Sequence, residues 1–221
     1  MSFLYPDYRT LEIRRLHSST VKACIGLHPT EANLEILPDV LALIRKNAHD
    51  LVGIGECGLD FTPKVLGNDG DKVKQIQRHV FAAQAALSVE LDLPLNVHSR
   101  CAGHHAISLL KEAGVKRCVL HAFDGKPKYA RQAAESMGYF FSIPPSAVRS
   151  PEKRKLISQL PLSSLLIETD SPALGPTSKD RNVPSNAVIA CQVISEVKGI
   201  SAEEVAHTTT ENATKLFKLS F

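Results

Sequence analysis

The chain has 221 residues, of which 43% are hydrophobic and 22% are charged. This composition suits one sizeable hydrophobic core, so we expect a single domain over residues 1–221 and exclude an intrinsically disordered chain. The formal net charge of +3 is compatible with a polyanionic substrate but too weak to indicate one.

The cysteines and the hydropathy pattern bear on the cellular compartment. Five cysteines lie far apart without a C-x-x-C pair, so the spacing predicts neither a disulfide framework nor a zinc finger. The N-terminus lacks a basic segment followed by an apolar run, and no stretch approaches about eighteen apolar residues. We therefore expect an intracellular protein, cytoplasmic or nuclear, that does not act on a membrane.

Short apolar runs of strand length alternate with helical patterns along the chain. The predicted strands are residues 21–27, 51–55, 93–97, 117–120, 139–143 and 164–169. Helices are predicted over 5–17 (with Tyr8 and Leu11 facing inward), 37–44, 72–91, 185–197 and from a capping box at Ser201, whereas 62–72 is interpreted as a βα loop. This alternation predicts a parallel sheet, either doubly wound or closed as a barrel.

Acid-base and metal-binding side chains follow five of the six predicted strands. They are His28, Glu56, His98, His121 and Asp170. In a parallel α/β protein the carboxyl ends of the strands converge on one face, where active sites are assembled. A core or rim imidazole bonded to backbone is the favoured explanation of any one histidine taken alone. The joint pattern of nitrogens and carboxylates, however, suits a divalent ion and indicates hydrolysis.

The stretch GIGECGLDF (53–61) places Glu56 between glycines and adds a second carboxylate, Asp60, four residues on. Taken alone, glycines and a carboxylate at a strand end are typical of an ordinary turn. The stretch does not match the G-x-G-x-x-G/A pattern of dinucleotide-binding folds. It gains meaning only because other strands end in the same way.

Six motifs together resemble those of TatD-type metal-dependent deoxyribonucleases. They are GIGECGLDF, PLNVHSR (94–100), LHAFDG (120–125), YFFSIPPS (139–146), ETDSPALGP (168–176) and RNVPSN (181–186). They occur in the order and approximate spacing of that family, over about residues 21–217. The amino-acid sequences of these motifs are most similar to those of an animal branch of the family.

The resemblance implies a TIM-type (β/α)8 barrel of the metal-dependent hydrolase group that cleaves phosphodiester bonds in DNA with two divalent ions, Mg²⁺, Mn²⁺ or Zn²⁺. Carried over to this chain, Glu56 bridges the ions, His98 and His121 bind one of them, and Asp170 contacts the other and orients the attacking water. Glu56 and Asp170 are thus the expected catalytic residues.

Two further residues are expected to contact the substrate. Arg100 can pair its guanidinium with two phosphate oxygens, although a salt bridge at the rim is an equally good interpretation. His28 matches the family's G-L-H-P motif and is expected to line the pocket without being assigned as a ligand.

The chain departs from the family pattern at its N-terminus. Family members begin with a strand that ends in an H-x-H pair, and this chain contains no H-x-H. Its first predicted strand corresponds to the family's third, so we expect an incomplete barrel without strands 1 and 2, open edges that could self-associate, and one bound ion instead of two.

Two alternatives to an active DNA hydrolase stay open. The missing H-x-H is compatible with a catalytically impaired or regulatory form of such an enzyme. A related barrel hydrolase acting on amide or lactone bonds is a narrower alternative, but those sites often use a carboxylated lysine, and no predicted strand ends in lysine.

Overall fold

The computed structural model describes residues 6–219 and side chains from residue 9 onward. The strands in this part of the chain are β1 (Ala23–Ile25), β2 (Leu51–Gly58), β3 (Leu95–His98), β4 (Cys118–Leu120), β5 (Phe140–Ile143) and β6 (Leu165–Ile167). Each coincides with a predicted strand, although β2 and β3 extend further, to Gly58 and His98. The predicted strand pattern is confirmed.

Nine α-helices lie in residues 6–219. They are α1 (Pro6–Leu16), α2 (Leu37–Asn47), α3 (Pro63–Leu66), α4 (Gly70–Leu91), α5 (Gly103–Glu112), α6 (Pro127–Met137), α7 (Pro151–Gln159), α8 (Ala187–Lys198) and α9 (Ala202–Phe217). The predicted inward position of Leu11 is confirmed by its burial, whereas the Tyr8 side chain lies outside the described residues. At the start of α9, the Ser201 side chain accepts a hydrogen bond from the Glu204 N–H, as the capping box predicts.

The interpretation of residues 62–72 as a loop is wrong in part. The short helix α3 occupies Pro63–Leu66, and α4 begins at Gly70, two residues earlier than predicted. Proline at the first position of a helix costs nothing, because its missing N–H would have no partner there and its φ already suits the helix. Pro63 therefore starts a helical turn inside the segment.

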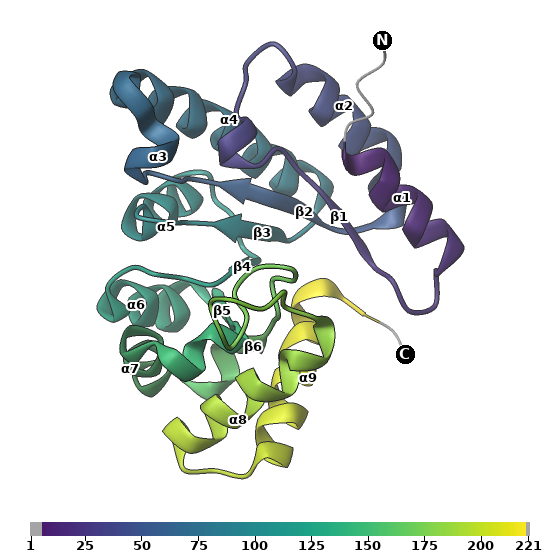
Figure 1. Cartoon of the computed structure of the whole chain (residues 1–221). Helices are drawn as coiled ribbons and strands as arrows, with labels where there is room; N and C mark the ends of the chain where they lie inside the picture. Colours follow the sequence, from purple (N-terminus) through teal and green to yellow (C-terminus); the bar gives the residue numbers. More distant parts are fainter. Residues whose placement is uncertain (1–5, 220–221) are drawn as a thin grey trace.

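The six strands form one parallel sheet in the order β1-β2-β3-β4-β5-β6. β1 and β6 each pair with one neighbour, so the sheet is not closed, and the expected incomplete barrel is confirmed. Figure 1 shows α1 near β1 and α9 beside β6, at the two ends of the sheet. The strands all point the same way, which brings their carboxyl ends to one side of the molecule.

Successive side chains of a strand point to opposite faces of the sheet, and helices pack against each face. The larger core joins the sheet to the surrounding helices, with Phe81 of α4 and Leu110 of α5 fully buried. On the opposite face, Val119, Phe140 and Leu166 pack against Leu216 near the end of α9. Thus α9 covers part of the face that a closed barrel would enclose, and it leaves a hollow of about 430 Å³ beside β6.

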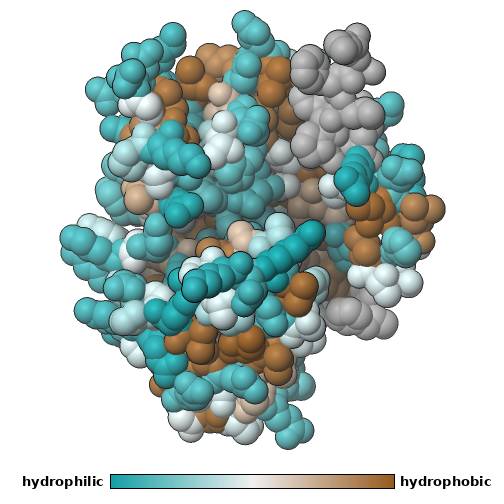
Figure 2. Space-filling view, in the orientation of Figure 1, coloured by the Kyte–Doolittle hydropathy of each residue, from teal (hydrophilic) through white to brown (hydrophobic). Residues whose placement is uncertain are grey.

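The surface shows few large apolar groups. Figure 2 shows hydrophilic residues over much of one face and a hydrophobic area in its lower half. Much of the surface of any folded protein is contributed by apolar atoms, so exposed hydrophobic residues are normal. Among residues 6–219, no helix combines the length and the apolar character needed to span a membrane.

Candidate metal centre and active site

The glycines of GIGECGLDF let β2 and β3 approach closely at the carboxyl end of the sheet. A Cβ at Gly58, whose φ is +140°, would lie 2.0 Å from the His98 carbonyl oxygen. A Cβ at Gly55, whose φ is +154°, would lie 2.6 Å from the Asn96 carbonyl oxygen. Glycine is required at both positions because a side chain would meet backbone and the φ values disfavour one. The close approach sets Glu56 against His98.

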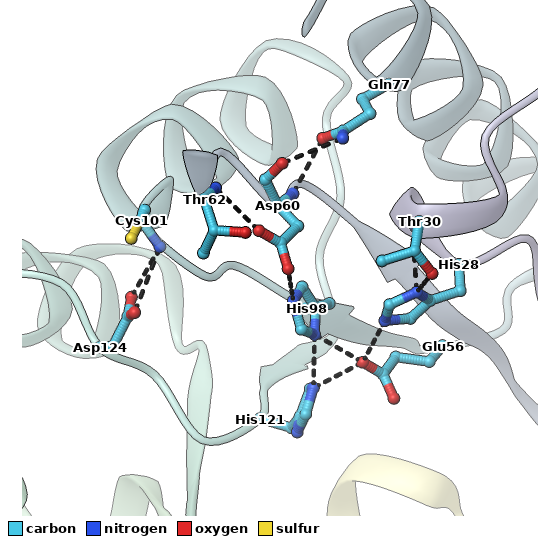
Figure 3. Close-up of polar contacts among 10 residues, drawn as sticks. All are labelled: His28, Thr30, Glu56, Asp60, Thr62, Gln77, His98, Cys101, His121 and Asp124. Carbon is cyan, nitrogen blue, oxygen red and sulfur yellow. Dashed lines mark hydrogen bonds and ion pairs between the residues drawn. The ribbon is translucent and has the colours of Figure 1, made fainter. Parts of the chain in front are cut away.

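Glu56 lies at the centre of three histidines. Its Oε1 is 2.7 Å from His98 Nδ1, 2.7 Å from His121 Nε2 and 3.1 Å from His28 Nε2 (Figure 3). These side chains come from β2, the end of β3, and the residues that follow β4 and β1. The strand-end pattern in the sequence is therefore a cluster in space, as the convergence of parallel strands predicts.

Two carboxylates that the sequence analysis left out of the site stand behind the histidines. Asp60 Oδ2 lies 3.3 Å from His98 Nε2, and Glu168 Oε2 lies 3.5 Å from His121 Nδ1. Histidines that bind metals commonly give their other ring nitrogen to a carboxylate, which fixes the ring orientation and tautomer. Asp60 belongs to the GIGECGLDF motif and Glu168 to the ETDSPALGP motif. Their place in these motifs could therefore have identified them as site residues.

Asp60 is itself held in place. Its backbone N–H donates to Gln77 Oε1 at 2.9 Å, and Gln77 Nε2 donates to the Asp60 carbonyl oxygen at 3.0 Å (Figure 3). The Thr62 N–H donates to Asp60 Oδ1 at 2.9 Å. Burial raises the pKa of the Asp60 carboxyl, but the hydrogen bonds from Thr62 and the proximity of His98 outweigh it and lower that pKa. Asp60 is thus a fixed acceptor for His98.

The loop that carries Asp170 is clamped by Asn182 of the RNVPSN motif. Asp170 has a φ of +56°, a conformation that is uncommon for a residue with a side chain. The buried Asn182 side chain donates from Nδ2 to the carbonyl oxygens of Thr169 and Ala173, both at 2.6 Å. These bonds on either side of Asp170 hold it near Glu56 and His121, with which it forms one group of possible metal ligands.

The pKa shifts of the cluster follow from its contacts. Burial raises the pKa of the Glu56 carboxyl, but hydrogen bonds from His121, His28 and His98 lower it well below its usual range. Burial lowers the pKa of His121, yet Glu168 and Glu56 raise it to about 10. Burial and the neighbouring carboxylates Glu168 and Glu56 raise the pKa of Asp170, against the opposing effect of His121. Acidic and basic groups are therefore strongly coupled here.

A buried lysine supports the loop after β4. Lys153 of α7 donates to the carbonyl oxygens of Ala122 and Phe123, next to His121. Burial lowers the pKa of Lys153 to about 8, although Asp124 and Glu168 partly oppose this. The Asp124 carboxylate in turn accepts the Cys101 N–H (Figure 3). Sequence reasoning did not identify Lys153, because its partners are backbone atoms about thirty residues away in the chain.

Arg100 and His28 occupy different positions relative to the cluster. Arg100 is exposed, and its guanidinium makes no ion pair or hydrogen bond within the described residues, so the alternative interpretation of a rim salt bridge is not observed. The His28 ring contacts Glu56 through Nε2 and Thr30 Oγ1 through Nδ1, at 2.7 Å for the latter. His28 therefore lies within the group of possible ligands, closer than a residue that only lines a pocket.

The donor set fits a divalent metal ion. Two groups, His28–Glu56–His98 and Glu56–His121–Asp170, each bring three ligand atoms within 4.8 Å of one another. His98 Nδ1 and His121 Nε2 are 3.3 Å apart, about the separation of two ligands on one tetrahedral zinc-sized ion. Imidazole nitrogen mixed with carboxylate oxygen suits Zn²⁺ or Mn²⁺, and the carboxylate share also admits Mg²⁺. The fold and these ligands define a metal-dependent hydrolase of the barrel type.

Comparison with known proteins identifies the family. The model for the TatD-related DNase family matches residues 4–218, and the chain belongs to this family. It is 47% identical to TATDN3 of Mus musculus, with 95% of this chain and 73% of that protein aligned. It is 45% identical to deoxyribonuclease TATDN3 of Homo sapiens, with 95% of this chain and 78% of that protein aligned.

A solved structure agrees with this assignment. The crystal structure of YJJV, a TatD homologue from Escherichia coli K12, superposes with a TM-score of 0.85 at 27% identity. The superposition covers 96% of this chain and 82% of that one. The resemblance drawn from the sequence motifs is therefore confirmed, including its animal branch.

Proposed function

We propose that this chain hydrolyses phosphodiester bonds in DNA, using divalent metal held by Glu56, His98, His121 and Asp170. The observation that carries the proposal is the convergence of three histidine nitrogens on Glu56 Oε1, at 2.7, 2.7 and 3.1 Å. Glu56 lies in β2, His98 ends β3, and His28 and His121 follow β1 and β4. Membership of the TatD-related DNase family and similarity to a human deoxyribonuclease support the DNA substrate.

Different side chains of the site have different roles in the proposed reaction. Asp170 lies beside Glu56, and burial together with the neighbouring carboxylates raises its pKa, which brings it closer to the range of a group that orients and deprotonates a water. Arg100 offers an exposed and unpaired guanidinium that can bind two phosphate oxygens. Asp60 and Glu168 hold the imidazoles so that their other nitrogens face the site.

When bound, a divalent ion lowers the pKa of a water and places positive charge next to a phosphoryl oxygen. Glu56 is the ligand common to both groups of donors, so it is the residue expected to bridge if two ions bind. His28 lies in the same cluster, and we propose that it borders the substrate and can reach the ions.

A nuclease assay with Mg²⁺ or Mn²⁺ on a labelled DNA oligonucleotide tests the proposal. Asp170→Asn and Glu56→Gln should each lower the rate by about a thousandfold or more, and chelation should abolish cleavage. Asp39→Asn and Glu203→Gln change exposed carboxylates of α2 and α9 in the same chemical way and should leave the rate unchanged. Cleavage that survives both site substitutions would contradict the proposal.

The same assay separates the alternative of an impaired or regulatory form. Such a form would bind DNA and metal without cleaving, whatever divalent ion is added. No structural observation favours this alternative, because Glu56, His98, His121 and Asp170 are gathered at one edge of the sheet.

Domain organisation, cellular location and self-association are also matters of proposal. We propose that residues 1–221 act as one domain and that the protein is intracellular, cytoplasmic or nuclear, which is supported by its five free cysteines. We also propose that copies can associate through β1 and β6, because each of these edge strands has a single partner. Sedimentation analysis over a range of protein concentrations tests the association.

A further inference from the structure

Lys153 lies close to the metal cluster without belonging to it. Its ammonium group reaches out from α7 and donates to the carbonyl oxygens of Ala122 and Phe123, the two residues that follow His121. Burying a charged group costs free energy unless the group is hydrogen-bonded, so this lysine depends on its two acceptors. Both acceptors belong to the backbone of one loop, which indicates that Lys153 fixes the path of that loop.

The loop after β4 has a backbone conformation that needs support. Ala122 has a φ of +41°, in the left-handed region that residues with a side chain disfavour. Such conformations persist where the surrounding structure holds them, and they are frequent at functional sites. Lys153 bonds the carbonyl group of Ala122 and that of Phe123, so it fixes the two peptide planes that follow the strained residue.

The same loop connects Lys153 to the metal cluster. The Ala122 N–H donates to Glu168 Oε1 at 2.8 Å, and Glu168 Oε2 lies 3.5 Å from His121 Nδ1. The other ring nitrogen, His121 Nε2, lies 2.7 Å from Glu56 Oε1 (Figure 3). Lys153 limits the rotation of Ala122 and thereby the direction of its N–H. A chain of contacts therefore runs from Lys153 through Glu168 to the ring of His121.

The helix that carries Lys153 is itself well anchored. α7 begins at Pro151, and the Ser150 side chain caps it by accepting a hydrogen bond from the Lys153 N–H at 3.2 Å. Leu156 and Ile157 of the same helix are buried in the larger core. The lysine side chain therefore reaches the loop from an element whose start and apolar face are both fixed.

We propose that Lys153 is a positioning residue for the metal site, because it holds the loop after β4 in the form that lets Glu168 orient the His121 ring. Histidine ligands are generally held by an outer partner, and loss of such a partner weakens metal binding. Lys153 stands one contact further out, behind Glu168. This inference rests on the metal site of the proposed function and adds to it a residue outside the ligand set.

Amide hydrogen exchange, measured by NMR on the metal-free protein, tests the first part of this chain of contacts. Lys153→Met keeps a long side chain and removes its donors, so the Ala122 N–H should exchange about tenfold faster or more. The His121 N–H donates to the Val97 carbonyl oxygen in the sheet and should exchange as it does in the wild type. Lys155→Met, which changes an exposed lysine of the same helix, is the matched control.

Binding of Mn²⁺, measured by titration calorimetry, tests the second part. Lys153→Met should weaken binding by about tenfold, and Lys153→Arg, which keeps cationic donors, should weaken it less. Because Lys153 acts through Glu168, a double variant of Lys153→Met and Glu168→Gln should bind about as weakly as Glu168→Gln alone. When Lys153→Met is combined with Asp60→Asn, which acts on His98, the two losses should multiply because the routes are separate.

Thermal melting of the metal-free protein shows whether Lys153→Met is folded. If it is not, Lys153→Gln takes its place in both measurements, because it keeps one amide donor in the same position. In a folded variant, an unchanged exchange rate at Ala122 or an unchanged affinity for Mn²⁺ would overturn the inference. Losses that multiply with that of Glu168→Gln would also overturn it, because they would show that Lys153 does not act through Glu168.

The outcomes distinguish this inference from the proposed function. A wild type that binds Mn²⁺ but cleaves no DNA would overturn the proposed function and leave the role of Lys153 standing. A wild type that cleaves DNA, together with wild-type affinity for Mn²⁺ in Lys153→Met, would overturn the role of Lys153 alone.

Discussion

His98 Nε2 lies 3.3 Å from Asp60 Oδ2, while the other nitrogen of the same ring faces Glu56. This contact makes Asp60 the residue that holds the imidazole in one tautomer, with Nε2–H toward Asp60 and the Nδ1 lone pair toward the site. The two carboxylates of GIGECGLDF therefore act on opposite sides of one histidine.

Asp60→Asn should weaken binding of the first divalent ion by about 10- to 100-fold, because an amide orients His98 less firmly and does not increase its basicity. Calorimetric titration with Mn²⁺ measures the change. Glu168→Gln should act in the same direction through His121, whereas Asp39→Asn on α2 is the control. Wild-type affinity in Asp60→Asn would show that Asp60 serves only the turn that ends at Thr62.

Arg100→Ala should weaken oligonucleotide binding by about 10- to 100-fold, which is the effect expected for charge-assisted hydrogen bonds to phosphate. Affinity for Mn²⁺ should stay nearly unchanged, because Arg100 contacts none of the possible ligands. Arg100→Lys keeps the charge but loses the paired geometry and should be intermediate. Arg9→Ala on α1 is the matched control, and loss of metal together with DNA in Arg100→Ala would assign Arg100 a structural role.

We expect one tightly bound divalent ion per chain. Glu56 belongs to both groups of possible ligands, so two ions would have to share it, and each would have only two further protein donors. With Glu56, His98 and His121 engaged by one ion, Asp170 is left as the main donor to a second, which should bind weakly. Titration calorimetry counts the ions.

If titration shows two bound ions per chain, the role of His28 changes. Two equally tight ions would contradict the prediction and would favour a division of ligands into His28–Glu56–His98 and Glu56–His121–Asp170. In that case His28→Ala should remove one ion. If one tight ion is correct, His28→Ala should leave it bound.

The ion pairs of Asp92 should make part of the stability dependent on pH. Asp92 follows α4 and binds Lys218 and Arg117, at 2.5 and 2.8 Å, which ties the end of α9 to the end of α4. Lys218 and then Arg117 lower the pKa of Asp92 in the folded state. A folded pKa below the unfolded value stabilises the protein above about pH 4, and this contribution disappears as the pH falls through the folded pKa.

Asp92→Asn should therefore lower the melting temperature slightly at pH 7, and the difference should disappear as the pH falls through the lowered folded pKa of Asp92. Asparagine suits this position because Asp92 has a φ of +50°, which asparagine tolerates. Thermal melts followed by circular dichroism measure the difference, with Asp71→Asn as the control on a weaker exposed pair. A difference that persists at low pH would assign the effect to the backbone and not to the charge.

The sequence by itself determined the elements and the side of the sheet on which chemistry occurs. Apolar runs of strand length and the helical spacing of Val73 to Leu91 are local properties, so the six strands and α4 could be predicted. Glu56 and His98 lie near the carboxyl ends of β2 and β3, His121 follows β4, and parallel strands bring their carboxyl ends together. The motif resemblance then supplied the family. The short helix at Pro63 was missed, and no residue ranges were predicted for α5, α6 and α7.

Only the tertiary structure decided which groups touch. Asp60 meets His98 because glycine at position 58 lets two backbones approach, and Asn182 clamps the Asp170 loop from twelve residues beyond it. Lys153 reaches its carbonyl partners, Ala122 and Phe123, from another helix. Such contacts depend on how distant segments pack in three dimensions, and no periodicity or local spacing in one chain encodes that packing directly.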